Sequence, residues 1–141
     1  MTEEPAAEDF NSRIIREFQA NGGEVSGQFV GAPRLLLTST GAKTGAQRTN
    51  PMMYLADGER LVVFASKAGA PTNPDWYHNL VAHPEATVEV GTERFGVTAT
   101  VLTGGERDEL YERQSVLYPG FAEYQAGTSR TIPVIALERT A

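Results

Sequence analysis

Residues 40–51, TGAKTGAQRTNP, combine two glycines, two cations and three threonines between two apolar runs. Gly41 and Gly45 can adopt positive φ angles and let a ligand approach the backbone closely. Lys43 and Arg48 can then neutralise an anion that is held there. A surface turn needs no such chemistry. The loop is therefore predicted to bind the phosphate or carboxylate part of a cofactor.

This loop is not the P-loop of nucleoside triphosphatases. Ala42 stands where that pattern requires a glycine before Lys-[Ser/Thr], and Leu37 stands where the pattern requires its first glycine. The loop also leads into Asn50-Pro51 rather than into a helix. Nucleoside triphosphate hydrolysis is excluded.

Two other pairs of residues are weak candidates for catalysis. Ser66 and Lys67 are neighbours, and adjacent side chains on an extended chain point to opposite faces, so they do not form an activated nucleophile pair. Ser66 is better interpreted as a hydroxyl donor at the mouth of a barrel. His78 and His83 have no third ligand or carboxylate cluster beside them, so no metal site is predicted.

Aromatic residues offer two interpretations each. Asn73 is a predicted N-cap with Pro74 at the first helical position, which places Trp76 in the first turn of a helix. Trp76 either belongs to the core or forms a wall beside an aromatic cofactor, with the helix N-terminus facing an anion. A second group is either core or a lid over a flat ring; its members are Tyr111, Tyr118, Phe121 and Tyr124.

The apolar pattern predicts the elements that position these residues. Strands are expected at 34–39, 48–55, 61–65, 87–90, 93–102 and 132–137, and helices at 10–20, at 75–82 and from about 106 to before Pro119. Leu110, Gln114 and Leu117 are expected to share the buried face of the last helix. The result is a mainly β fold with flanking helices, a small closed or split β-barrel of about six antiparallel strands. The cationic loop joins the first two strands of an antiparallel meander.

Composition limits the class of protein. The 141 residues suit a single domain, here residues 10–141, preceded by a segment 1–9 that is predicted to be disordered. A net charge of −6 argues against nucleic-acid binding. The absence of cysteine excludes disulfides and thiolate metal sites and fits a cytoplasmic protein. No apolar run is long enough to span a membrane, and the first residues lack the features of a signal peptide.

Four stretches, taken together and in order, resemble the deazaflavin-dependent nitroreductase family of split-barrel oxidoreductases. They are TGAKTGAQRTNPM, FASKAGAPTNPDWYHNL, HPEATVEV and YPGFAEYQAGTSRTIPV. Members of that family use the 8-hydroxy-5-deazaflavin coenzyme F-420. The likeness covers residues 29–137, nearly the whole predicted domain. It implies an FMN-binding split-barrel-like fold and a coenzyme with a phosphodiester and a polyglutamate tail, which suits the cationic loop.

The resemblance also implies a set of cofactor contacts. Lys43 and Thr44, with the backbone of Ala42, are expected to hold the phosphate and the acidic tail. Positions along the linker and ring are Arg48, Thr49, Asn50, Pro51, Met52 and Met53. Positions beneath the ring are Phe64, Ala65, Ser66 and Lys67. The phosphate and linker are flanked by Trp76, Tyr77 and Asn79, and Phe121 is expected to pack at the cofactor.

The implied reaction is hydride transfer from the reduced deazaflavin to an electron-poor acceptor such as a quinone, enone or nitroaromatic. Ser66, Tyr118 and Tyr124 are the candidates to orient or protonate the acceptor. Well-studied members of the family carry a tyrosine where this chain has Phe121, so its phenolic hydrogen bond is lost and nitroimidazole reduction is put in doubt. The partner is a small molecule, with no metal and no nucleic acid. A lipid quinone would add peripheral contact at the inner face of the membrane.

Two alternatives remain open from the sequence. One is an oxidoreductase of the same barrel that uses FMN, whose anionic tail is shorter. The other is a non-catalytic protein that binds and sequesters the deazaflavin. The sequence does not indicate an oligomeric state.

Overall fold

The computed structural model describes residue 15 and residues 34–140. The predicted disordered segment 1–9 and nearly all of the predicted helix 10–20 lie outside the described residues. The strands are β1 (Arg34–Thr40), β2 (Gln47–Met53), β3 (Leu55–Asp57), β4 (Arg60–Phe64), β5 (Glu85–Val90), β6 (Glu93–Leu102) and β7 (Val134–Arg139). The helices are the short 3-10 helix η2 (Lys67–Gly69) and the α-helices α3 (Asp75–Ala82), α4 (Gly104–Leu117) and α5 (Gly120–Ala126).

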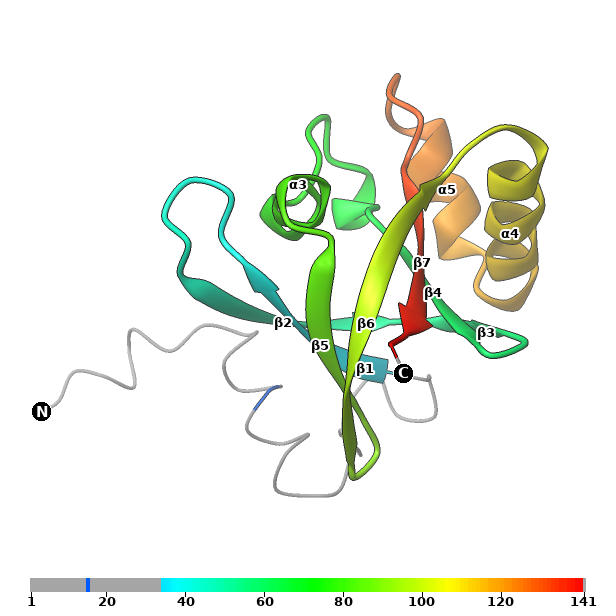
Figure 1. Cartoon of the computed structure of the whole chain (residues 1–141). Coiled ribbons are helices and arrows are strands. Elements are labelled where there is room, and N and C mark those ends of the chain that lie inside the picture. The colour runs from blue at the N-terminus through cyan, green and yellow to red at the C-terminus, as the bar shows by residue number, and fades with distance from the viewer. Residues whose placement is uncertain (1–14, 16–33, 141) are drawn as a thin grey trace, which may run out of the picture.

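The strands form one antiparallel sheet in the order β2-β1-β5-β6-β7-β4-β3 (Figure 1). β2 and β3 stand at opposite ends of this order, yet only Tyr54 separates them in the chain. The sheet must therefore curl until its two edges approach each other. The predicted split barrel of antiparallel strands with flanking helices is confirmed.

Seven strands form the sheet, where about six were predicted, because the predicted strand 48–55 is divided between two partners. Met53 pairs with Arg34 of β1, whereas Leu55 pairs with Val62 of β4. The predicted meander is therefore present as two hairpins, β1–β2 and β3–β4, which lie at opposite ends of the strand order. A local apolar pattern does not reveal that a strand changes its partner.

Two cores lie on the two faces of this sheet, because successive side chains of a strand point to opposite faces. In β7, Ile135 faces the first core and Val134 the second. The barrel core consists of Leu35, Leu37, Val63, Ala65, Trp76, Leu80, Val88, Val97, Ile135 and Leu137. The helix-side core consists of Leu55, Val62, Phe64, Leu102, Leu110, Tyr111, Phe121, Ile132, Val134 and Ala136.

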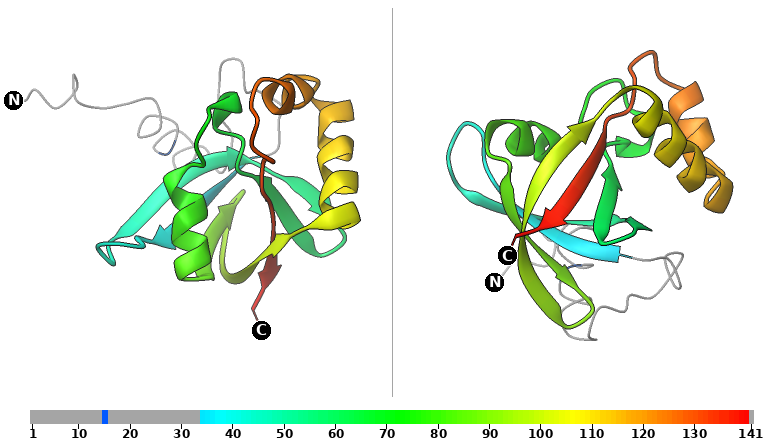
Figure 2. Two further views of the ribbon diagram at one scale, coloured as in Figure 1. Left: turned by 90° about the horizontal axis from the view of Figure 1, so that it is seen from above. Right: turned by 45° about the vertical axis from the view of Figure 1, so that its right-hand side comes forward.

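The α-helices lie on different sides of the sheet (Figures 1 and 2). α3 packs near β1 and contributes Trp76 and Leu80 to the barrel core. α4 and α5 contact each other and cover the face of β4 and β7 that carries the helix-side core. α5 also contacts η2, so the segment that follows β4 lies between the sheet and the last helix.

Two details of the helices differ from the prediction. The N-cap of α3 is Pro74 and it forms no side-chain cap bond, because Asn73 Oδ1 accepts a hydrogen bond from Arg130 instead. The buried face of α4 is centred on Leu110, Tyr111 and Gln114, and Leu117 at its margin is 59% exposed.

Candidate functional site: a cationic cavity at the rim of the barrel

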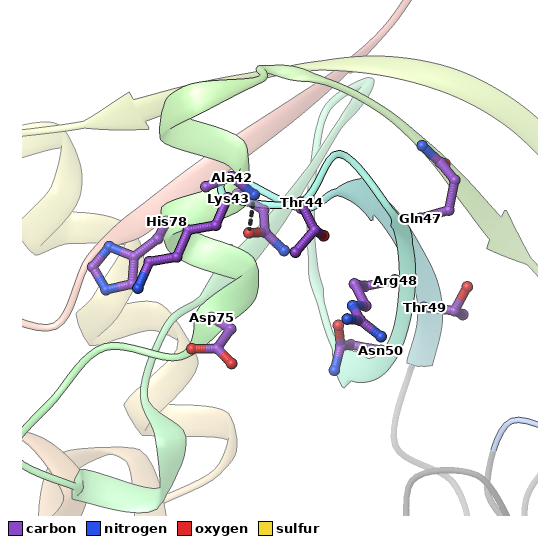
Figure 3. A pocket seen from close by; sticks show the side chains of 11 residues that line it. Ala42, Lys43, Thr44, Gln47, Arg48, Thr49, Asn50, Asp75 and His78 are labelled. Atoms are coloured by element: carbon purple, nitrogen blue, oxygen red, sulfur yellow. Dashed lines mark hydrogen bonds between the residues drawn. The ribbon is translucent and has the colours of Figure 1, made fainter.

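A cavity of about 600 Å³ opens where the β1–β2 loop meets α3 (Figure 3). Its walls come from the loop, from the first half of β2 and from one face of α3. The lining residues are Gly41, Ala42, Lys43, Thr44, Gln47, Arg48, Thr49, Asn50, Asp75, His78 and Asn79. Seven of these are predicted cofactor-binding positions: Ala42, Lys43, Thr44, Arg48, Thr49, Asn50 and Asn79.

Hydrogen bonds within the loop explain its two glycines. The Gly41 N–H donates to the Ala46 carbonyl at 2.7 Å, and the Gly45 N–H donates to the Gly41 carbonyl at 2.9 Å. A Cβ on Gly41 would lie 3.0 Å from Thr44 Oγ1 and 3.1 Å from Ala46 O, so a side chain there would require the loop to shift. Gly45 has φ +77°, a conformation that other residues adopt at a cost. The glycines therefore shape the loop itself.

Asn79 fixes the loop to α3. Its Oδ1 accepts a hydrogen bond from the Ala42 N–H at 2.9 Å (Figure 3), and its Nδ2 donates to Ser39 Oγ at 3.4 Å. The side chain is only 7% exposed. The Ala42 amide, predicted to hold the phosphate, thus donates to Asn79 in this structure, and its contact with the phosphate stays a prediction. Asn79 acts on the loop from the floor of the cavity.

The two cations of the cavity have no carboxylate partner in the part of the chain that the structure describes. Lys43 and Arg48 are exposed, and no salt bridge involves them among residues 34–140. In the same part of the chain, five other arginines are paired with carboxylates: Arg60, Arg94, Arg107, Arg113 and Arg139. An acidic protein thus leaves two positive charges available at one cavity, which suits an anionic ligand.

Two residues of α3 line the cavity although the sequence did not mark them as part of the site. Asp75, His78 and Asn79 lie at positions i, i+3 and i+4, a spacing that places them on one helix face. Figure 3 shows the Lys43 side chain extending towards His78, with Asp75 on the same side. The spacing alone could have signalled this grouping once Asn79 was assigned to the site.

The second candidate histidine, His83, does not line the cavity. His83 forms the C-cap of α3, and its backbone N–H donates to the Asn79 carbonyl at 2.7 Å. Within the described residues, no group of three or more His, Cys, Asp or Glu side chains is placed to hold a metal ion.

The residues predicted to contact the ring do not line this cavity. On β2, Pro51, Met52 and Met53 are half-buried; Met52 packs against the barrel core and Met53 against the helix-side core. After β4, Ser66 is half-buried and Lys67 is exposed. The side chains of Phe64 and Ala65 are buried in the two cores, which leaves only their backbone for a cofactor.

Trp76 belongs to the barrel core and is 9% exposed. Of its two interpretations, the structure favours the core. Tyr77 is half-buried and packs edge-on against the His78 ring, with 5.4 Å between the ring centroids. Neither residue lines the cavity, and their contacts with the cofactor stay predictions.

The C-terminal aromatics divide into core residues and partly open ones. Phe121 is 8% exposed and packs edge-on against Phe64, Tyr111 and Tyr124. The Tyr111 hydroxyl donates to the Phe121 carbonyl at 2.6 Å, and burial raises the pKa of Tyr111 to about 12. Phe121 is thus an anchor for α5. Tyr118 and Tyr124 remain half-buried beside this cluster.

A curled antiparallel sheet whose two edge strands approach each other, with helices on both sides, defines the split-barrel fold. The family model for F420H(2)-dependent quinone reductases matches residues 11–139 of this chain. An F420H(2)-dependent quinone reductase of Mycobacterium tuberculosis is 40% identical over 126 residues, which are 86% of this chain and 85% of that protein.

Two solved structures are similar over most of the chain. One is an F420-H2 dependent reductase (FDR-A), with a TM-score of 0.69 and 39% identity, covering 75% of this chain and 94% of that one. The other, described as a domain-swapped dimer, has a TM-score of 0.71 and 36% identity, with 90% and 93% covered.

The chain belongs to the F420H(2)-dependent quinone reductase family. The predicted cofactor, coenzyme F-420, and the predicted class, an oxidoreductase that uses its reduced form, are confirmed. The nitroreductase type, which is the narrower part of the prediction, does not appear in the descriptions of this family model and these relatives.

Proposed function

We propose that this protein reduces a quinone with reduced coenzyme F-420. The phosphate and polyglutamate tail of the coenzyme lie in the cavity between the β1–β2 loop and α3. The ring lies along the second half of β2, above the segment that follows β4 and below α5.

The residues of the cavity fit the anionic part of this coenzyme. Lys43 and Arg48 are the observation that carries the proposal, because both face the cavity and neither is paired with a carboxylate in the described part of the chain. Thr44, Thr49 and Asn50 add hydroxyl and amide groups along the same wall. A volume of about 600 Å³ is also in the range of cofactor sites.

The bound coenzyme supplies the hydride, and the protein binds, orients and shields the reactants. Lys43 and Arg48 hold the tail, which fixes how far the ring reaches along β2. Ser66 contributes a hydroxyl from the segment after β4. Tyr118 and Tyr124 are half-buried on the acceptor side, where a phenol can orient or protonate an acceptor oxygen. Tyr111 is excluded from that role because its hydroxyl is committed to the Phe121 carbonyl and its pKa is raised to about 12.

Titration of the purified protein with F-420 and, separately, with FMN tests the cofactor. Saturable binding of F-420 and turnover of a soluble quinone such as menadione with reduced F-420 are the expected results. Arg48→Gln should weaken F-420 binding, whereas Arg94→Gln removes the same charge from the β5–β6 hairpin and should leave it unchanged. Tight FMN binding without F-420 binding would establish the FMN alternative, and F-420 binding without turnover would establish a sequestering protein.

Nitroaromatic reduction is a second activity to test in the same assay. Phe121 is buried in the aromatic cluster and carries no hydroxyl, so the acceptor loses one hydrogen-bond donor. We expect quinones to be reduced faster than nitroimidazoles, because a quinone needs only the donors that Ser66, Tyr118 and Tyr124 retain. Faster reduction of a nitroimidazole than of a quinone would contradict this expected order of rates.

A lipid quinone would bring a cytoplasmic enzyme to the inner face of the membrane. No helix in residues 34–140 is long and apolar enough to cross a membrane. Val116 and Leu117, at the end of α4 next to Tyr118, are 74% and 59% exposed and border an open groove of about 420 Å³. We propose this end of α4 as the membrane-facing surface. Val116→Glu should reduce binding to quinone-containing vesicles without changing menadione turnover, and unchanged vesicle binding would contradict the assignment.

A further inference from the structure

The segment that leads from β4 towards α3, residues 65–73, contains a residue with an unfavourable backbone conformation. Lys67 has φ +47° and is the one non-glycine residue with a positive φ among the residues that the structure describes. Such a conformation is unfavourable for a residue with a Cβ and persists only where the surroundings enforce it. Gly69, with φ +81°, lies directly against α5: a Cβ there would be 3.1 Å from the Tyr124 carbonyl oxygen and 3.2 Å from Tyr124 Cα.

A single guanidinium holds this segment in place. Arg130 Nε donates to the Ala70 carbonyl at 2.8 Å, and Nη2 donates to the Ser66 carbonyl at 2.7 Å. Nη1 donates to the Ala65 carbonyl at 3.1 Å and to Asn73 Oδ1 at 2.7 Å. The four acceptors bracket the strained Lys67 from both sides. Arg130 thus ties together the beginning, middle and end of the segment.

The chemistry of these bonds requires an arginine. All four acceptors are neutral oxygens, and the half-buried Arg130 has no carboxylate partner among residues 34–140, so burial lowers its pKa. The planar fork of a guanidinium can reach four acceptors in different directions, whereas a lysine ammonium is a single point with three donors.

Arg130 is itself held in position by α5. Its carbonyl accepts a hydrogen bond from Gln125 Nε2 at 2.7 Å. Gln125 Oε1 accepts from the Ile132 N–H at 3.0 Å and from Arg107 Nη2 at 2.7 Å. The guanidinium of Arg130 is therefore fixed relative to the helix that carries Tyr124, and the segment 65–73 is fixed relative to both.

We infer that Arg130 is a positioning residue for the ring part of the cofactor site. It holds Ser66 and Lys67 in the one conformation in which this segment meets the deazaflavin ring, and it sets their position relative to α5. This inference rests on the proposed function, since the segment matters to catalysis only if the ring lies above it. The cavity that holds the tail is built by other residues and does not depend on Arg130.

Three variants and two ligands test the inference. Arg130→Gln removes most of the donors, Arg130→Lys keeps the charge, and Arg60→Gln is the matched control. Arg60 is also half-buried and joins two segments through Asp57 and Glu106, but it makes no hydrogen bond to residues 65–73. The ligands are F-420 and 8-hydroxy-5-deazariboflavin, which has the ring and ribityl chain but no phosphate or tail. Hydrogen exchange of the peptide covering residues 65–73 is followed in the ligand-free protein.

Arg130→Gln should raise the Kd for both ligands by about tenfold or more, because several charge-assisted hydrogen bonds are lost. The ratio of the two Kd values should stay as in the natural protein, because the tail cavity is intact. Exchange in residues 65–73 should become faster. Arg60→Gln should lower the thermal midpoint as well, but should change neither Kd by more than about twofold. Arg130→Lys should fall between the natural protein and Arg130→Gln.

Equal effects of the Arg130 and Arg60 variants on the Kd values would overturn the inference, as would unchanged exchange in residues 65–73. If Arg130→Gln does not fold, Arg130→Lys is compared with Arg60→Gln in the same way. Failure of the natural protein to bind F-420 would contradict the proposed function. The exchange measurement in the ligand-free protein would then still decide whether Arg130 holds the segment.

Discussion

The two parts of the proposed cofactor site are stabilised in different ways. The tail part is an exposed hairpin loop whose charges, Lys43 and Arg48, take no part in holding the fold together. The ring part is bordered by buried aromatics, with Phe64 and Phe121 edge-on at a centroid distance of 5.8 Å, and by the guanidinium of Arg130. Substitutions of Lys43 and Arg48 should therefore change affinity alone. Substitutions in the ring part should change stability and function together.

The electrostatics of the two parts differ in the same sense. In the tail part, unpaired and solvated charges face an anion, so binding there should weaken as salt screens them. In the ring part, Arg107 and Arg130 donate mainly to neutral carbonyl oxygens in partly buried surroundings, where salt has little effect. Salt sensitivity of F-420 binding should thus arise from Lys43 and Arg48.

Phe121→Ala should give the largest effect, and on stability. Removal of a buried phenylalanine leaves a cavity beside Phe64 and Tyr111 and should lower the free energy of unfolding by about 3–5 kcal/mol. Urea denaturation without ligand measures it. A loss below about 1 kcal/mol would show that α5 is not anchored by this ring. It would contradict the claim that the ring part of the site stabilises the fold.

Asn79→Ala tests a residue that should affect both affinity and stability. It lines the tail cavity, but its buried amide bonds to Ala42 and Ser39, so its loss should cost about 1–3 kcal/mol of stability and also weaken F-420 binding. Ser39→Ala is the matched control, because it removes only the bond to Nδ2 and keeps the Ala42 contact. Equal losses of affinity in both variants would show that the Ala42 bond does not shape the cavity.

Tyr111 gives the ring part a signature in alkaline solution. Burial raises its pKa to about 12, against about 10 in an unfolded chain, so the unfolded state releases the proton first as pH rises. This contribution is complete below about pH 10 and is lost as pH rises towards 12. The natural protein should therefore lose more stability between these pH values than Tyr111→Phe, measured as urea midpoints at each pH. Parallel pH profiles of the two proteins would contradict the burial of this phenol.

Asp75→Asn should give the smallest effect, with opposite signs for binding and stability. Its carboxylate lines the cavity and repels an anionic tail, so its removal should strengthen F-420 binding by about 0.2–1 kcal/mol at low salt. The same carboxylate lies in the first turn of α3, and the free energy of unfolding should fall by about 0.3–1 kcal/mol. Weaker binding in this variant would mean that the tail does not pass near Asp75.

Much of this organisation is visible in the sequence because it is local. The loop 40–51 showed its cations and glycines directly, and the alternation of apolar residues located most strands. The division of residues 48–55 into β2 and β3 was hidden, because the change of partner at Tyr54 depends on how the whole sheet closes. Long-range hydrogen bonds were hidden as well: nothing near Arg130 in the chain shows that it reaches Ala65 and Asn73.

The burial of individual aromatics was equally hard to predict. Trp76 and Phe121 have types and spacings that suit a cofactor wall as well as a core, and only the packing of α3 and α5 on the sheet decides. The same limitation applies to the Ala42 amide, whose partner lies 37 residues away in Asn79. Residue types thus indicated the cationic cavity, whereas the division between cavity and core needed the fold.

The central claim, that the cavity binds the anionic tail of F-420, is tested most directly by Lys43→Ala with the full coenzyme and with 8-hydroxy-5-deazariboflavin. The variant should bind F-420 more weakly by about 1–3 kcal/mol, the scale of a charge-assisted hydrogen bond, and should bind the tail-less ring as the natural protein does. Its urea midpoint should be unchanged. An equal loss of affinity for both ligands, or a loss of folding, would contradict the claim.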